Sequence, residues 1–419
     1  MKLPSMKNGC AVERISSTEP EDTKDPTLNE RCEVNKEDKP EKGERSVYNG
    51  ARISRMLLAV YGDRRYRRKL IIHLDIRNTI LVADSVTDVS VEEALNSYLT
   101  GVVWGKEQDG EWKFFSKEPS LRAPAPGLCT YYRYLERQLV KIPTNRAELQ
   151  HQTGDFVHTP KGEQFLEHFN KHLELLRWTY GNETSHHKVL TMSGRDGKPY
   201  HYILPSVYKL ISSLHERQRD FAIVIRTFGR DASNVLSSLQ YGLHGNHPAV
   251  PKKINLQVHK TPGVVKRGKN NIELVSYKPG GGQEIQTKLV HEKDIYRSLC
   301  DAQGITGYVD DFRFWQNKHY DHEAGKPFWI DLNDQRHHHI FFDDNFRPDE
   351  EDSIIDVRMF SVEAPSVAVS LDHELVAKLE NVCLVQADLL KSIKDEDYFI
   401  RMTNECEEKF YDMFDSGQD

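Results

Sequence analysis

The sequence places polar side chains directly after apolar runs, where strands are expected to end. These side chains are Asp75, Thr227, Asp343 and Asp344. An aspartate at a strand end can act as a nucleophile or a metal ligand, and a threonine hydroxyl can donate to a phosphoryl oxygen. Lys326, which precedes the last run, offers a positive charge that offsets the charge of nucleophile and phosphate together. These residue types therefore indicate phosphate chemistry.

The neighbouring carboxylates Asp343 and Asp344 also indicate a metal ion. Together with Asp75 they would supply the oxygen ligands that Mg²⁺ takes, while the ion keeps several waters and a phosphate oxygen. The histidine triplet 337–339 is a weaker pattern. Because it lies where a strand begins, alternate side chains point to opposite faces, and the three cannot all bind one ion.

Short β-type runs must position these residues. LIIHLD, FAIVIRTFG and HHHIFFDDN are typical of strands in a parallel sheet that is buried on both faces, and DSIIDVRMF is a fourth candidate strand. In such a sheet, ligands bind outside the carboxyl ends of the strands, which is where the polar side chains stand.

Helical patterns separate the strands. They cover residues 206–218 and 231–242, and the segments HELVAKLENVCLVQADLLKSI and DEDYFIRMTNECEEKFYDMF near the C-terminus each predict an amphipathic helix. Lys326 is expected at the start of a further short helix. Strands that alternate with helices predict an α/β fold with a mostly parallel sheet.

The chain is expected to divide into a tail, a core and two insertions. Residues 1–45 are polar and charged and cannot bury enough apolar surface to fold, so they predict a disordered tail. Residues 46–84 and 205–419 form the predicted core, and 85–204 form a large first insertion. A second insertion, about 243–318, contains a predicted β-hairpin around the glycine-rich turn of NIELVSYKPGGGQEIQTKLV.

The order of these motifs resembles that of the haloacid dehalogenase-like (HAD) superfamily. That family has an apolar strand ending in DxDx[TV], a Ser or Thr after the second strand, a Lys, and an acidic pair after a later apolar strand. Here the four motifs read HLDIRNT, IVIRT, GKPFW and IFFDDN, and the resemblance spans about residues 70–360. It implies a HAD-like Rossmannoid parallel sheet, with 85–204 as the cap that closes over the site and selects the substrate.

The resemblance also implies a role for each candidate residue. Asp75 would be the nucleophile that forms an aspartyl-phosphate, and Thr227 and Lys326 would hold the phosphoryl group. Asp343 and Asp344 would bind Mg²⁺ together with Asp75.

The sequence departs from the family pattern at Arg77. The family's phosphatases carry a second Asp there, which protonates the leaving oxygen and then activates water; arginine stays protonated and cannot do this. General acid–base catalysis is worth about 10²–10⁴-fold, so slow turnover of alkyl phosphates is expected. Arg77, with Asn78 beside it, would bind an anionic group of the substrate; alternatively, Arg77 pairs with a carboxylate or marks a site that has lost catalysis and kept binding.

The bulk properties limit the partners. A net charge of -7 and a pI of about 6.3 argue against nucleic acid as the main partner. No apolar run is long enough to span a bilayer, and the 6 cysteines form no CxxC pair, so a cytoplasmic or nuclear setting is expected.

Three functions follow from these patterns. The leading one is a Mg²⁺-dependent phosphohydrolase or phosphotransferase acting on a phosphorylated small molecule or a phosphoprotein. The rival is a catalytically silent HAD-like protein that binds a phosphorylated ligand or a protein partner. The third is a purely structural α/β module, which would be favoured if Lys326 and Asp343 lay far from Asp75.

Overall fold

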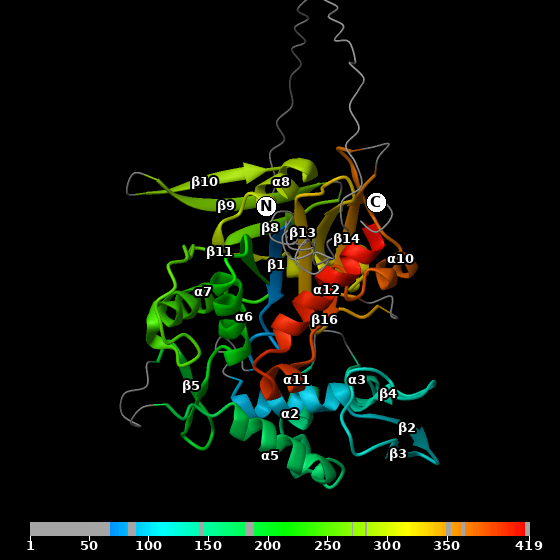
Figure 1. Cartoon of the computed structure of the whole chain (residues 1–419). Coiled ribbons are helices and arrows are strands. Elements are labelled where there is room, and N and C mark those ends of the chain that lie inside the picture. The colour runs from blue at the N-terminus through cyan, green and yellow to red at the C-terminus, as the bar shows by residue number, and fades with distance from the viewer. Residues whose placement is uncertain are drawn as a thin grey trace, which may run out of the picture. The chain divides into compact units, whose positions relative to one another are not determined.

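Eight strands form the central sheet of the computed structural model (Figure 1). The structure describes residues 68–82, 89–141, 146–180, 188–269, 271–280, 283–348, 353–361 and 365–414. The strand order is β10 (Gln283–Leu289), β9 (Ile272–Gly280), β8 (Gly263–Arg267), β11 (Gly304–Val309), β7 (Phe221–Thr227), β1 (Lys69–Asp75), β13 (His337–Asp343) and β16 (Leu384–Gln386). The predicted disordered tail, 1–45, lies outside the described residues.

The sheet is parallel from β8 to β16, and the antiparallel hairpin β9–β10 extends it on one side. The predicted α/β class, the three principal strands and the hairpin are therefore confirmed. From β1 the chain adds β7 and β11 on one side, and later β13 and β16 on the other. The strand order thus reverses at β1, and the carboxyl end of such a strand is where open α/β sheets bind ligands.

The two faces of β1 are covered by different layers. Leu70, Ile72 and Leu74 pack in one core cluster with residues of α6 (Pro205–Glu216), α7 (Ala232–Tyr241) and α12 (Tyr398–Phe414). Figure 1 shows these three helices lying across the sheet.

The opposite face of the sheet carries a helix and a second, smaller sheet. Ile71 packs in a cluster with residues of α8 (Glu292–Cys300), Trp329 and Phe360. The second sheet has the order β12 (Lys326–Asp331), β14 (Ile355–Phe360) and β15 (Ala368–Ser370). Because side chains alternate along a strand, Asp75 points to the same face as Ile71 and thus toward this second sheet.

The described part of the first insertion contains short helices and strands. They are α2 (Val91–Val102), β2 (Trp104–Gln108), β3 (Glu111–Phe114), β4 (Cys129–Thr130), α3 (Tyr131–Leu139), α4 (Ala147–Gly154), α5 (Leu166–Leu175), β5 (Thr191–Ser193) and β6 (Pro199–His201). Ser90 caps α2 in a capping box with Glu93.

The first insertion packs next to the carboxyl end of β1. Leu95 and Leu99 of α2 share one core cluster with Ile76, which directly follows Asp75, and with Ile80 in the loop after it. In Figure 1, α2 and α5 lie below the sheet. Residues 56–419 form one compact unit, and the division of this unit into a core and a cap stays a prediction.

Two predicted helices are wrong. Lys326 does not start a helix: it is the first residue of strand β12, whose sequence KPFWID pairs in parallel with β14. The buried aromatic residues Phe328 and Trp329 pack in the clusters beneath the main sheet, and that burial favours the extended chain over a single helical turn.

The segment predicted as one amphipathic helix before α12 is broken. It forms α10 (His373–Lys378), strand β16 and α11 (Leu389–Lys394). Four consecutive residues, Val382 to Val385, are buried in the turn before β16 and in its first two positions, and an amphipathic helix cannot bury four consecutive side chains. The predicted second insertion supplies β8, β9, β10 and β11 to the main sheet, where β11 lies between β7 and β8.

Candidate active site

Lys326 joins the carboxylates of two strand ends. Its Nζ lies 2.5 Å from Oδ1 of Asp75 and 2.7 Å from Oδ2 of Asp343. All three side chains are buried, and Asp343 and Lys326 are at most 1% exposed. Asp75 and Asp343 are brought together by the parallel register of β1 and β13, in which Leu74 pairs with Phe342. Lys326 reaches them from the second sheet, so three separate segments build this contact.

Asp344 stands at the edge of this contact and is held by its neighbours. Asn78 donates from Nδ2 to Oδ2 of Asp344 at 3.3 Å, and Asn345 donates to Oδ1 at 3.1 Å. The backbone N–H of Asp344 donates to the hydroxyl of Thr79 at 3.2 Å. Asn78 has a positive φ of 59°, which a short polar residue tolerates, and this turn aims its amide at Asp344. The loop after β1 therefore fixes the acidic pair after β13.

The charges of this cluster do not balance. Asp75, Asp343 and Asp344 carry three negative charges when ionised, whereas Lys326 supplies one positive charge. Burial raises the pKa of Asp75 to about 7; Lys326 pulls it down and Asp343 pushes it up. Burial, followed by the charges of Asp343 and Asp75, raises the pKa of Asp344 above its usual range. Burial opposes the charge on Lys326, but Asp343 and Asp75 outweigh it and raise the pKa of the lysine.

The same carboxylates can meet one cation. One oxygen each from Asp75, Asp343 and Asp344 lie within 4.8 Å of one another. An all-oxygen donor set of this kind suits a hard divalent ion such as Mg²⁺. A divalent ion would also cancel the two negative charges that Lys326 leaves over, so the residues present fit the expected ion.

A buried ion pair behind the site was not predicted. Arg226 of β7 stands opposite Asp75 in the register and donates to Asp310 through Nε at 2.9 Å and Nη2 at 2.5 Å. It also donates to the carbonyl of Pro327 at 3.0 Å, next to Lys326 in the chain. Arg226 is 1% exposed. The sequence could have indicated this ion pair, because FAIVIRT places an arginine inside an apolar run and a buried guanidinium requires a partner.

Thr227 and Arg77 lie near the site in different ways. Thr227 is buried at the end of β7, one residue beyond Arg226, and its hydroxyl accepts the N–H of Gly229 at 2.8 Å. Arg77 is exposed, while Ile76 beside it is buried. The structure thus brings together Asp75, Lys326, Asp343 and Asp344 with Asn78, and places Thr227 on the adjoining strand end and Arg77 at the surface.

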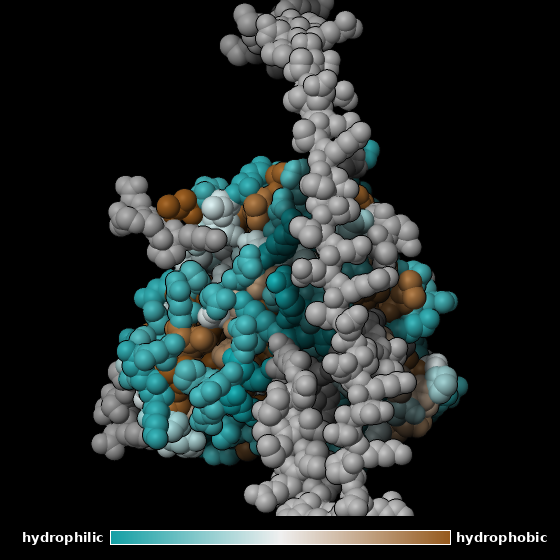
Figure 2. All heavy atoms as spheres, turned by 45° about the horizontal axis from the view of Figure 1, so that its top comes forward, coloured by the Kyte–Doolittle hydropathy of each residue, from teal (hydrophilic) through white to brown (hydrophobic). Residues whose placement is uncertain are grey.

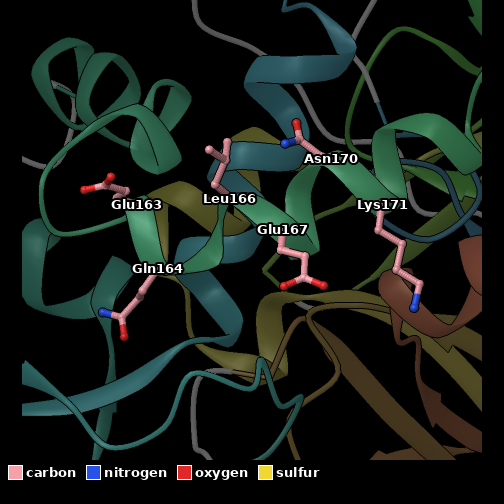
Figure 3. A pocket seen from close by; sticks show the side chains of 6 residues that line it. All are labelled: Glu163, Gln164, Leu166, Glu167, Asn170 and Lys171. Carbon is pink, nitrogen blue, oxygen red and sulfur yellow. The ribbon is translucent and has the colours of Figure 1, made fainter.

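A surface hollow lies away from these residues. It is an open space of about 720 Å³ along α5 and the short helical turn before it, lined by Glu163, Gln164, Leu166, Glu167, Asn170 and Lys171 (Figure 3). These side chains come from one continuous segment and converge on no common point (Figure 3). None of the predicted site residues lines this hollow, so the hollow is not part of the candidate active site.

The described surface in Figure 2 is mainly hydrophilic, with hydrophobic residues in small separate groups. Among the described residues, no helix is both long and apolar enough to cross a membrane. Comparison of the chain with protein-family models, with curated proteins and with solved structures found no match.

Proposed function

We propose that this protein is a HAD-like, Mg²⁺-dependent enzyme that transfers a phosphoryl group through an aspartyl-phosphate on Asp75. The contact of Lys326 with both Asp75 and Asp343 carries the proposal, because it joins a strand-end carboxylate, a lysine and an acidic pair from distant segments. Mg²⁺, held by Asp75, Asp343 and Asp344, would offset the charge of these carboxylates and of the phosphoryl oxygens.

The chain's own residues would act in two steps. A carboxylate oxygen of Asp75 attacks phosphorus, so an Asp75–phosphorus bond forms while the bond from phosphorus to the leaving oxygen breaks. Water then attacks phosphorus, the bond to Asp75 breaks, and phosphate leaves with the carboxylate restored. Lys326 stabilises the negative charge that gathers on the phosphoryl oxygens in both steps. Thr227, at the adjoining strand end, would donate a hydrogen bond to the phosphoryl group.

The position that carries the general acid in the family pattern is occupied by Arg77, so the leaving oxygen would not be protonated from there. Arg77 follows Ile76, and its guanidinium stays protonated and does not transfer a proton to the leaving oxygen at neutral pH. The substrates that fit best are therefore phosphorylated small molecules or phosphoproteins whose leaving group departs without protonation.

Hydrolysis of para-nitrophenyl phosphate tests the proposal, since the phenolate leaves with little need for an acid. The wild type should hydrolyse it with Mg²⁺, and Asp75→Asn should be inactive while its circular dichroism is unchanged. Activity that survives in Asp75→Asn would refute the nucleophile assignment.

Arg77 favours a second candidate function, a silent protein that binds a phosphorylated ligand or a protein partner. An arginine at the surface beside a carboxylate site can bind an anion without turning it over. Binding of Mg²⁺ or phosphate by the wild type, without hydrolysis of para-nitrophenyl phosphate, would support this second function and oppose the first.

A further inference from the structure

A second group of metal-ligand side chains lies at the opposite end of the sheet from Asp75. It consists of Cys300, the last residue of α8, Asp334 in the loop after β12, and His337, the first residue of β13. One ligand atom from each residue lies within 4.8 Å of the other two. His337 and Asp343 are the two ends of β13, six residues apart, which is about 20 Å along a strand. This group is therefore separate from the carboxylates around Lys326.

The distances within this group suit a tetrahedral ion. Zn²⁺ binds cysteine sulfur at about 2.3 Å and histidine nitrogen or carboxylate oxygen at about 2.0–2.2 Å. Tetrahedral angles then place sulfur and oxygen ligands about 3.5 Å apart, and nitrogen and oxygen ligands about 3.3 Å apart. Here Sγ of Cys300 is 4.0 Å from Oδ2 of Asp334, and Nδ1 of His337 is 2.8 Å from the same oxygen. Changes of about half an ångström would bring these two distances to their tetrahedral values, and Sγ and Nδ1 lie within 4.8 Å of each other.

The histidine triplet divides between the two faces of β13. His338 points away and lies 2.7 Å from the carbonyl of Val382, whereas His339 lies on the same face as His337. Nε2 of His339 is 3.3 Å from Sγ of Cys300, and its Nδ1 is 3.1 Å from Nε2 of His73. With its proton on Nε2, His339 would donate to a Cys300 thiolate, the kind of outer contact that stabilises a metal-bound sulfur.

The surroundings of the group are polar and nearly closed. Cys300 is 4% exposed and His339 is 5% exposed, while Asp334 and His337 are half-buried and leave a path for an ion. Tyr296 donates to Oδ2 of Asp334 at 3.0 Å, which orients this carboxylate. The nearby Lys69 ammonium donates to the backbone carbonyls of Cys300 and Ala302 at the end of α8.

The charges of the donors match a divalent ion. A thiolate and a carboxylate carry two negative charges, and His337 coordinates as a neutral ring. On binding, the Cys300 thiol would release its proton, and His337 would keep its proton on Nε2 while Nδ1 binds the ion. The hydrogen bond between His337 and Asp334 is then replaced by two bonds to the same ion.

We propose that Cys300, Asp334 and His337 form a zinc site at the amino end of β13, with water in the fourth position. A sulfur, a nitrogen and an oxygen ligand form a borderline-soft donor set, which suits Zn²⁺ and not Mg²⁺. The ion ties the end of α8 to the loop that leads into β13, so its binding stabilises the folded chain.

Titration of the metal-free full chain with Co²⁺ tests this site, because Co²⁺ takes zinc positions and a thiolate ligand gives it a charge-transfer band in the near ultraviolet. The band should appear at one equivalent in the wild type and in Asp75→Asn, whose altered site offers only oxygen and amide ligands. It should disappear when Zn²⁺ is added. The matched control Cys129→Ser, which replaces a half-buried cysteine outside the group, should keep the band.

Two variants decide the outcome. Cys300→Ser should lose the band, and His337→Asn, at a half-buried position that tolerates the change, should bind Co²⁺ at least about tenfold more weakly. Zn²⁺ should raise the melting temperature of the wild type but not that of His337→Asn. A wild type without the band, or a band that persists unchanged in both variants, would overturn the proposal. Should Cys300→Ser not fold, His337→Asn alone decides.

Discussion

Replacing Lys326 with methionine should destabilise the protein in a pH-dependent way. Methionine keeps the length and the apolar stem of lysine but leaves Asp75 and Asp343 buried without their cation. Removing one partner of a buried ion pair costs about 3–5 kcal/mol, and Lys326 serves two carboxylates, so we expect the upper part of this range at pH 8.

The loss should shrink at lower pH. Without the lysine, the pKa of Asp75 rises further above its value of about 7. A carboxyl with a raised folded-state pKa gives stability that is present below its unfolded value, near 4, and is lost as the pH rises through the folded value. Each further unit of pKa shift is worth about 1.4 kcal/mol, so the difference between variant and wild type should be larger at pH 8 than at pH 5.

Urea unfolding in EDTA at both pH values measures this difference. Lys288→Met is the matched control, because Lys288 pairs with Glu273 at 2.9 Å but is 52% exposed, and its loss should change stability by less than about 1 kcal/mol. Equal stability of Lys326→Met and wild type at pH 8, or a deficit that is the same at both pH values, would refute the charge argument.

Three further perturbations follow from the structure. Asp310→Ala leaves the guanidinium of Arg226 buried without its carboxylate, and urea unfolding should show a loss of about 3–5 kcal/mol; a loss below 1 kcal/mol would contradict the buried pair. Burial lowers the pKa of His201 to about 4 and that of His247 to about 3. Below pH 6.5 the unfolded chain therefore binds more protons at these two rings than the folded chain does. Their titration should lower the free energy of unfolding by about 3–4 kcal/mol between pH 6.5 and pH 5. His247→Phe should flatten this pH slope, and an unchanged slope would show that other groups cause it. Arg77→Asp restores an acid at the surface of the site and should raise hydrolysis of an alkyl phosphate such as glycerol phosphate by up to about 10²-fold in a steady-state assay; no increase would mean that more than the missing acid limits the site.

The sheet and most of the site were predictable because they depend on local patterns. The sequences before Asp75 and Asp343 are apolar runs typical of buried strands, and each run ends in a carboxylate. Neighbouring parallel strands place their carboxyl ends at the same edge of the sheet. Lys326 was predicted as a site residue although its predicted helix was wrong. Its position next to Asp75 depends on a second sheet, formed with β14 and β15, that no pattern within GKPFWIDLND specifies.

The remaining errors concern long-range contacts. Strand β16 is short and lies between two helices, so an amphipathic pattern runs across it, and only pairing with β13 makes it a strand. Strand β11 contains two glycines, so its sequence is typical of a loop, and its pairing with β7 and β8 makes it a strand. The partner of Arg226 lies 84 residues away at Asp310, and the sequence contains no signal that joins them.

The buried carboxylates themselves argue against a purely structural role. Asp75 and Asp343 lie within hydrogen-bonding distance of Lys326, whereas a purely structural module would have been favoured by Lys326 and Asp343 lying far from Asp75. When ionised, the three carboxylates leave two negative charges that Lys326 does not balance, in a site that is largely withdrawn from water. Well-packed apolar residues of the same volume would be as stable or more stable. The cluster thus costs stability unless a cation occupies it. This favours a site that binds a metal ion. Where the bound ion also holds a phosphoryl group, the enzyme and the silent binder differ only in whether that group is transferred to Asp75. Wild-type turnover separates the two, and Asp75→Asn then assigns the turnover: because the variant lacks the nucleophile yet keeps an oxygen ligand beside Lys326, an enzyme should lose hydrolysis while retaining part of its affinity for phosphate.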